Sequence, residues 1–135
     1  MKSNNIIVSG KRKRAVAKAI LTAGNGNITI NNNNYKNLHM LDKLKIDEPL
    51  RIAEHIIGKI NFDVKITVVG GGEKGQLDAA RLALARAISK FANSQKLTDA
   101  FTEYDRTLLV ADVRRKETNK PGDSKARSQR QSSKR

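Results

Sequence analysis

The chain has no cysteine and no tryptophan, and only two of its 135 residues are proline. Without cysteine it can form no disulfide bond and no thiolate metal site, which suits a reducing compartment. Its apolar runs are all far shorter than the roughly 20 residues that span a bilayer, and residues 1–5 lack the apolar core of a signal peptide. These absences predict a soluble, intracellular protein.

Aromatic side chains are also scarce. The chain has only three phenylalanines and two tyrosines: Tyr35, Phe62, Phe91, Phe101 and Tyr104. Proteins that bind single-stranded nucleic acid stack bases on aromatic rings, so recognition of that kind is not expected here. A chain of this composition would bind a nucleic acid through its phosphates and its shape.

Positive charge is the property that the chain has in excess. Lysine and arginine number 27 against 13 aspartates and glutamates, and the net charge is +14. The C-terminal residues 114–135 supply half of this excess, with nine basic and two acidic side chains. Their only apolar residues are Pro121 and Ala126, so no burial offsets the entropy lost on ordering them alone. We therefore expect an extended basic tail that becomes ordered on a polyanion.

Nucleic acid is the polyanion best able to use such a tail. A membrane surface would also attract the charge, but membrane binding of this kind needs an amphipathic basic helix or a lipid signal. The tail has no apolar face. We therefore favour nucleic acid over a membrane as the partner.

Residues 1–113 have the length of one small domain. Alternating apolar residues predict strands at residues 6–8, 15–22, 28–30 and 62–68. Residues 15–22 alternate small and branched side chains, as in a strand that packs closely on both faces. The turn signal at 23–27 predicts that 28–30 returns as the second arm of a hairpin, and the asparagine run 31–34 predicts a turn or loop.

Three helices are also expected, one before the strand at 62–68 and two after it. Asp47 can cap the first helix, with Pro49 in its first turn, and an apolar stripe then runs to Gly58. Apolar residues at helical spacing predict a second helix over 76–91 and a third over 97–104. This order of elements predicts an α+β fold: a single two-layer sandwich of one β-sheet with helices on one face.

The segment from Gly70 to Gln76 is the most specific local signal. Three consecutive glycines, with a fourth at Gly75, separate a predicted strand from a long helix. The segment lacks the register and the Lys-Ser/Thr pair of nucleotide-binding loops. A plain tight turn is possible, but three glycines lose more chain entropy than a turn requires. A seat for an RNA backbone fits the charge best, because glycines permit close approach and a helix N-terminus offers N–H groups.

The basic cluster Lys11–Arg14 has two interpretations. It is either a solvated basic turn or a contact with RNA. Its place beside Gly10, ahead of a closely packed strand, favours the RNA contact.

The remaining polar residues predict no metal, cofactor or catalytic site. His39 and His55 have no partner at the spacing of metal ligands. Capping and surface solvation explain Asp42, Asp47 and Glu48 better than an acidic catalytic site does.

Four stretches of the chain together carry a family resemblance: Ser9–Ala17, the glycine segment with residues 79–88, Tyr104–Arg115, and the run from Lys120 to Arg135. Their residues and spacing resemble those of the S-nine family of small-subunit ribosomal proteins, in its archaeal and eukaryotic branch. The resemblance covers nearly the whole chain. One position departs from it. That branch usually has tyrosine before the terminal arginine, where this chain has Lys134. At this position we therefore expect a contact with a phosphate group in place of stacking by an aromatic ring.

The resemblance implies a non-enzymatic constituent of the head of the small subunit, in the cytoplasmic ribosome. It implies a mixed sheet with a left-handed β-α-β crossover, against the general right-handed rule. Residues 1–113 would form a globular RNA-binding domain, and residues 114–135 a tail that is ordered on RNA. The implied partners are small-subunit rRNA, neighbouring head proteins and the anticodon stem-loop of tRNA in the peptidyl site.

These expectations assign a role to individual residues. By the resemblance, the tail contacts tRNA through Arg135, Lys134 and Arg130. The expected rRNA contacts are the glycine segment and the basic residues of the body and the tail: Lys11, Arg12, Lys13, Arg14, Gly70, Gly71, Gly72, Lys74, Gln76, Arg106, Arg114, Arg115, Lys116, Lys120, Lys125 and Arg127.

Two other classes of protein compete with this interpretation. Small-molecule kinases and the protein subunit of ribonuclease P resemble it in fold class. A kinase needs an ATP-binding loop in register and an acidic metal site, and the sequence shows neither. The ribonuclease P subunit keeps its basic residues on a helix and groove, whereas here half of the excess charge lies in residues 114–135. A free-standing nucleoid or general RNA-binding protein is the second rival. Co-sedimentation with small subunits through a high-salt wash would separate a ribosomal protein from a loose binder.

Overall fold

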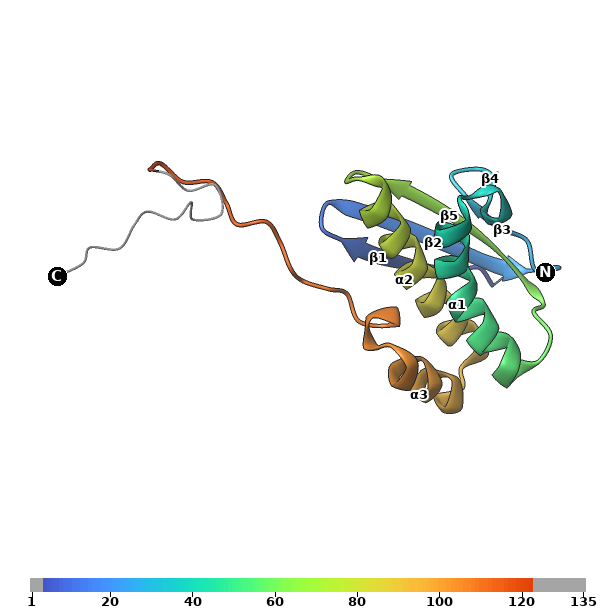
Figure 1. Ribbon diagram of the computed structural model, residues 1–135. Helices are drawn as coiled ribbons and strands as arrows, with labels where there is room; N and C mark the ends of the chain where they lie inside the picture. Colours follow the sequence, from blue (N-terminus) through green and yellow to red (C-terminus); the bar gives the residue numbers. More distant parts are fainter. Residues whose placement is uncertain (1–3, 123–135) are drawn as a thin grey trace.

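The structure, a computed structural model, describes residues 4–122 (Figure 1). Within these residues a five-stranded sheet and three α-helices form an α+β fold, which confirms the predicted class. The elements follow the chain as β1 (Ile6–Arg12), β2 (Ala15–Ala23), β3 (Ile28–Ile30), β4 (Asn33–Asn34), the 3-10 helix η1 (Tyr35–Asn37), α1 (Met40–Ile57), β5 (Phe62–Val69), α2 (Glu73–Ala92), α3 (Gln95–Tyr104) and the 3-10 helix η2 (Arg106–Leu108).

The sheet is mixed, with its strands in the order β1-β2-β5-β3-β4. β2 is antiparallel to both β1 and β5, whereas β3 is parallel to β5 and antiparallel to β4. The predicted hairpin between residues 15–22 and 28–30 is therefore wrong, because β5 lies between the two strands. β3, α1 and β5 form a β-α-β unit, and its left-handed crossover stays a prediction.

An aspartate from β5 holds the loop between β2 and β3. Asp63 Oδ1 accepts hydrogen bonds from the backbone N–H groups of Asn25, Gly26 and Asn27 at 2.9, 3.0 and 2.9 Å. These bonds, with that from Asn27 foremost, hold the pKa of Asp63 below its ordinary value. The chain bends within the turn predicted at residues 23–27, its N–H groups bind Asp63 of β5, and the next strand lies beyond β5 instead of beside β2.

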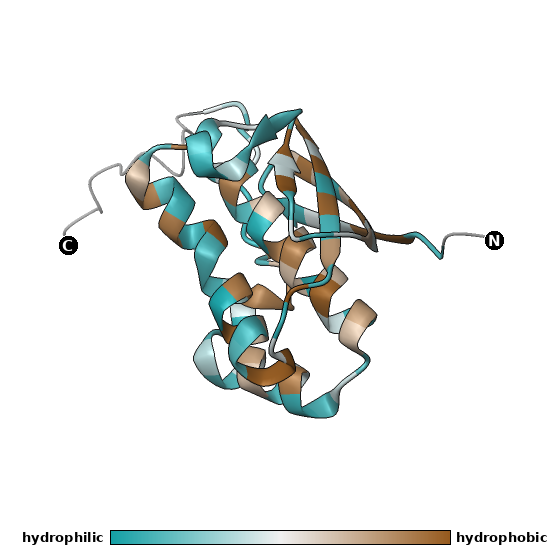
Figure 2. Ribbon diagram, turned by 90° about the vertical axis from the view of Figure 1, so that its right-hand side faces the viewer, coloured by the Kyte–Doolittle hydropathy of each residue, from teal (hydrophilic) through white to brown (hydrophobic). Residues whose placement is uncertain are grey.

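The helices cover one face of the sheet (Figure 1, Figure 2). Every second side chain of β2 and β5 is buried, and those between them are exposed or half-buried. The prediction that residues 15–22 pack closely on both faces is therefore wrong, since Val16 is 38% exposed and Lys18 is exposed. The small buried side chains of β2 pack only on the face that α2 covers.

Small residues let α2 lie directly on β1 and β2. Gly10 of β1 faces the helix, where an added Cβ would come within 2.4 Å of the Ala79 carbonyl oxygen and 2.7 Å of the Ala83 nitrogen. Ala79 and Ala83 are fully buried, as is Ala17, the partner of Gly10 on β2. The alanines of α2 thus allow a close contact between the helix and the sheet.

The first helix begins earlier than predicted. α1 starts at Met40, so Asp47 and Pro49 lie inside it and not in its first turn. The free energy gained by burying Ile46 and Pro49 in the core outweighs the cost of the backbone hydrogen bond that proline cannot donate. Asp47 lies beside Tyr35, and burial together with a hydrogen bond to Asp47 raises the pKa of Tyr35 to about 12. The predicted end at Gly58 is confirmed, with φ of 93°.

Three other boundaries differ from the sequence prediction. β1 continues to Arg12, which places the first half of the basic cluster in a strand. α2 begins at Glu73, which places Gly75 inside the helix. In the asparagine run, Asn31 and Asn32 turn the chain with φ of 50° and 68°, values that asparagine tolerates better than most residues, and the other two asparagines form β4.

Gly10→Ala tests the close contact between α2 and the sheet. The added methyl group would meet the backbone of the helix, which cannot rotate away, so we expect the free energy of unfolding to fall by about 1–3 kcal/mol. Chemical denaturation measures the change. Gly75→Ala is the matched control, because its Cβ would meet its nearest neighbours at 3.7 and 3.9 Å and alanine favours a helix. Equal stability of the two variants would contradict the described packing.

Candidate nucleic-acid interface

The two segments singled out in the sequence lie against each other at one end of the sheet (Figure 1). Lys13 and Arg14 form the turn between β1 and β2, and the glycine segment follows β5. A Cβ on Gly70 would lie 2.7 Å from the Arg14 carbonyl oxygen, and one on Gly71 would lie 2.9 Å from the Ala15 nitrogen. The fold thus joins two segments that are far apart in the sequence into one surface.

The glycines have a structural role of their own. Gly70 and Gly71 have φ of 76° and 67°, and the β1–β2 turn leaves no room for a side chain at either position. Gln76 Nε2 closes the segment by donating to the Gly70 carbonyl oxygen at 3.0 Å. Of the three consecutive glycines, only Gly72 has open space where a Cβ would lie. A tight turn therefore explains the first two glycines, and RNA contact by this segment stays a prediction.

The basic side chains at this end fall into two groups. Four of them are exposed and form no ion pair within residues 4–122: Lys11, Lys13, Arg14 and Lys74. Arg12 differs, because its side chain is only 20% exposed, pairs with Asp112 and lies 3.9 Å from Asp78. Its charge is balanced within the protein, which sets it apart from these four side chains.

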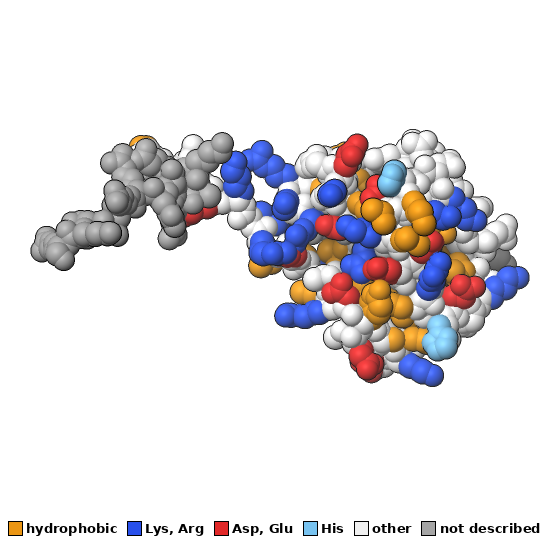
Figure 3. Space-filling view, in the orientation of Figure 1, with side chains coloured by type: hydrophobic (Ala, Val, Ile, Leu, Met, Phe, Trp, Pro, Cys, Tyr) orange, Lys and Arg blue, Asp and Glu red, His pale blue; other side chains and the backbone are white. Residues whose placement is uncertain are grey.

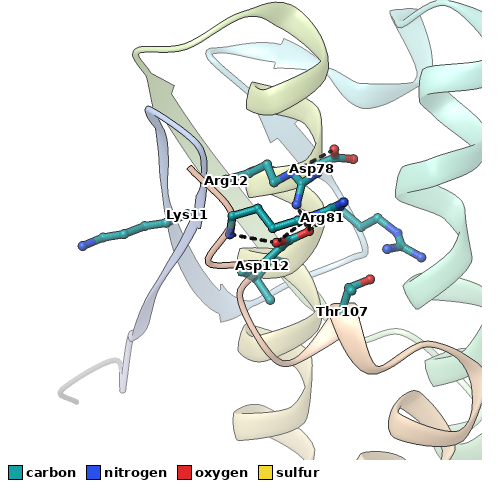
Figure 4. Close-up of a pocket in the computed structure, with 8 residues that line it drawn as sticks. Lys11, Arg12, Asp78, Arg81, Thr107 and Asp112 are labelled. Carbon is teal, nitrogen blue, oxygen red and sulfur yellow. Dashed lines mark hydrogen bonds and ion pairs between the residues drawn. The ribbon is translucent and has the colours of Figure 1, made fainter. Parts of the chain in front are cut away.

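A hollow of about 180 Å³ lies beside this surface, where β1, α2 and the chain after α3 meet (Figure 4). Both carboxylates that line it are engaged. Asp112 pairs with Arg12 and Arg114, and Asp78 lies 3.9 Å from Arg12 and 3.7 Å from Lys45. The polar lining of this hollow is therefore a cluster of ion pairs between acidic and basic side chains.

Asp112 connects the body to the start of the basic segment. It pairs with Arg12 of β1 and accepts hydrogen bonds from Arg114, at 3.0 Å from the backbone N–H and at 2.9 and 2.7 Å from Nε and Nη2. The hydrogen bonds from Arg114, followed by that from Arg12, hold the pKa of Asp112 well below its ordinary range. Both arginines were predicted to contact RNA, and the fold gives them this shared carboxylate.

Two arginines of α2 hold residues 105–112, which we call the strap. Arg86 donates from Nε to the Leu109 carbonyl oxygen and from Nη1 to the Ser9 carbonyl oxygen, both at 3.0 Å. Arg81 pairs with Glu48 of α1 and lies 3.4 Å from Asp105.

Sequence reasoning missed these two roles, because a helical arginine resembles a solvated cation until folding brings its acceptors near. The signal available for Arg86 was its position between Ala85 and Ala87. Both alanines are fully buried, so the arginine between them emerges close to the core.

The remaining predicted contacts lie on the strap and in the residues after it. Arg106 lies on the strap and is exposed, as are Arg115, Lys116 and Lys120 further along. Figure 3 shows lysine and arginine side chains gathered where this segment leaves the body. From Ala111 to Lys120 the chain forms neither helix nor strand. Five predicted contacts lie outside the described residues: Lys125, Arg127, Arg130, Lys134 and Arg135.

Metal clusters and membrane-spanning helices are absent from residues 4–122. No three histidine or acidic side chains in this range come close enough to hold a metal ion. His39 stands at the N-cap position of α1 without a side-chain capping hydrogen bond, and His55 lies in the last turn of that helix. None of the helices in the same range is long and apolar enough to cross a membrane.

Residues 10–135 match the family described as ribosomal protein S9/S16. Small ribosomal subunit protein uS9 of Thermoplasma volcanium is 46% identical over 130 residues, which are 95% of this chain and 96% of that protein. The protein of the same name from Methanococcus vannielii is 45% identical over 119 residues, 85% of each chain. That of Methanothrix thermoacetophila is 42% identical over 126 residues, 93% of this chain and 94% of the relative.

The family match spans the β1–β2 turn, the glycine segment, α2 and the strap, which are the parts that meet at the basic end of the body. The family expected from the sequence motifs is thereby confirmed. This chain belongs to the ribosomal protein S9/S16 family.

Proposed function

We propose that this protein is a structural, non-enzymatic constituent of the small ribosomal subunit in the cytoplasmic ribosome, and that it binds rRNA with the basic end of its body. Membership of a ribosomal protein family supports the structural role. One observation supports the choice of surface: the β1–β2 turn, the start of α2 and the segment after the strap converge on the same end of the molecule.

Electrostatics favour a polyanion at this end. Of the acids at this end, Asp78 and Asp112 are engaged by basic side chains of the body, and Glu73 is exposed at the start of α2 beside Lys74. Lys13, Arg14 and Lys74 keep their charge exposed to solvent. Such cations release counterions when they bind phosphates, which is the main source of affinity between proteins and nucleic acid backbones.

Replacing Lys13 and Arg14 with glutamine tests this interface. We expect weaker binding to small-subunit rRNA and a slope of log affinity against log salt concentration that is shallower by about 2, because each phosphate contact accounts for about one released counterion. Fluorescence titration of the full-length protein at several salt concentrations measures both. Lys90→Gln with Lys96→Gln is the matched control, since both lysines are exposed on the helical layer. An equal effect of the two variants would contradict an interface at this end.

The residues from Arg114 onward are proposed to extend through rRNA to the anticodon stem-loop of tRNA in the peptidyl site. Extended, these residues span at most about 70 Å, enough to pass from a body at the RNA surface into the interior. Small polar residues between the charges keep the segment thin and offer hydrogen bonds to phosphate and sugar. Arg135 can bind two phosphate oxygens at once, whereas Lys134 acts as a point charge and Arg130 is a third contact.

Deleting Lys134 and Arg135 should weaken the binding of tRNA in the peptidyl site while small subunits still assemble. The reason is that the proposed tRNA contacts are lost, whereas the body keeps its contacts with rRNA. Purified subunits that contain the shortened protein would be titrated with tRNA, and sucrose gradients would report their assembly. Subunits with Lys90→Gln and Lys96→Gln lose the same charge and serve as the control. Unchanged tRNA affinity would refute the tRNA contact.

Asp112 is proposed to determine the direction in which the basic segment leaves the body. Its pKa is lower in the folded state than in the unfolded state. Its ion pairs therefore stabilise the fold fully above the unfolded pKa, near 4, and this stabilisation is lost as the pH falls through the folded pKa. Acid, or removal of the charge, should free the strap from β1.

Asp112→Asn removes this charge at neutral pH. We expect faster hydrogen exchange at the amides of Leu109 and Val110, which donate to the Arg106 carbonyl oxygen at 3.2 and 3.1 Å. Nuclear magnetic resonance would follow both amides. Asp99→Asn makes the same change of charge on α3 and should leave them unaffected. Equal exchange in the two variants would show that Asp112 does not hold the strap.

A further inference from the structure

The face of the sheet that the helices leave uncovered has a regular arrangement of side chains. The strand register places them in three rows across β1, β2 and β5. From the β1–β2 turn outward, the rows are Lys11, Val16 and Val69; then Ser9, Lys18 and Thr67; then Ile7, Ile20 and Lys65. Each row contains one lysine, and the lysine moves over by one strand from each row to the next.

The three lysines therefore form a diagonal stripe. Neighbouring strands lie about 4.8 Å apart and successive rows about 7 Å apart, so consecutive lysines lie about 8 Å apart at their Cα atoms. All three are exposed, and none forms an ion pair within residues 4–122. Lys11 points away from the ion-pair hollow in Figure 4. The stripe begins beside Lys13 and Arg14 and so continues the basic end of the body across the sheet.

Charge distinguishes the uncovered face from the helical layer. The three α-helices carry eight acidic and eight basic side chains, which balance. The strands carry four basic side chains and one acidic side chain, Asp63. Asp63 is already engaged by three backbone N–H groups. Lys11, Lys18 and Lys65 therefore give the uncovered face an excess of positive charge over Asp63, the one acid in these strands.

We propose that the uncovered sheet face is a second RNA-binding surface, on which Lys11, Lys18 and Lys65 contact the phosphates of rRNA. This inference rests on the proposed function and extends the contact from one end of the body to a whole face. Phosphates are the expected targets, because the three rows contain no aromatic ring on which a base could stack. Ser9 and Thr67 beside Lys18 can donate hydrogen bonds to phosphate oxygens.

The same observations favour RNA over a protein partner. Lysine is depleted from the cores of protein–protein interfaces, which are apolar and rich in aromatic residues. Here Lys18 occupies the middle of the middle row, so any partner that covers this face must accept a lysine at its centre. The apolar side chains of this face form two separate pairs, Val16 with Val69 and Ile7 with Ile20, and the polar row that contains Lys18 lies between them.

The absence of cysteine makes the surface testable with single reactive sites. Lys18→Cys and Lys65→Cys, each in the full-length chain within assembled small subunits, would carry an iron chelate that cleaves nearby RNA through hydroxyl radicals. Lys13→Cys probes the basic end, and Lys96→Cys on α3 probes the helical layer. We expect positions 18 and 65 to cleave neighbouring nucleotides of rRNA, and position 96 not to cleave those nucleotides.

The two proposals fail in different ways. Cleavage from position 13 without cleavage from 18 or 65 would overturn the sheet-face proposal and leave the proposed function standing. If positions 13, 18 and 65 all fail to cleave although the protein is present in the subunit, binding of rRNA by the body fails as well. A cross-link from position 18 to another protein, without RNA cleavage, would identify a protein occupant and overturn the inference.

Charge reversal gives an independent measurement. Lys18→Glu with Lys65→Glu should make the salt dependence of rRNA binding shallower by about 2, whereas Lys90→Glu with Lys96→Glu should not change it. All four lysines are exposed, so neither variant disturbs the core, and thermal unfolding would verify this. An unchanged slope in the sheet variant would overturn the proposal.

Discussion

The packing of α2 on β1 and β2 positions every other part of the candidate interface. Gly10 on the sheet, with Ala79 and Ala83 on the helix, leaves almost no space between the two backbones. Because α2 lies this close, its first turn and the glycine segment come against the β1–β2 turn. For the same reason Arg86 reaches the Ser9 carbonyl oxygen and the strap at once. A few small side chains therefore decide where the charged ones can act.

Three arginines differ in their place in the fold from the lysines of the sheet. Arg12, Arg81 and Arg86 are half-buried, and each joins separate elements through its planar set of donors. The lysines of the β1–β2 turn and of the sheet are exposed, where a compact charge on a flexible stem suits a phosphate in solvent. Cations near the core are thus paired with acids or carbonyl groups, and the excess positive charge is carried by side chains that point outward.

The distribution of charge gives the body an orientation toward a polyanion. The helical layer is balanced, whereas the sheet and the residues from Arg114 onward are positive. On the two proposals together, the basic end and the uncovered sheet face contact rRNA and the helices face away. Asp112 links β1 to the beginning of the basic segment, so the placement of the body on RNA would also determine where the tail enters it.

Local sequence was enough to predict the α+β class, the strand at 62–68, the helix end at Gly58 and the family, because periodicity, caps and motifs are local. It failed where distant residues compete. Pro49 resembles a helix start, but the helix begins at Met40 and buries Ile46 and Pro49 itself in the core. Asp63 binds the loop where the sequence predicted a hairpin, and Asp112 reaches Arg12 only after folding. Such pairings leave no periodic trace along the chain, so only the folded chain reveals which cations are paired and which face stays open.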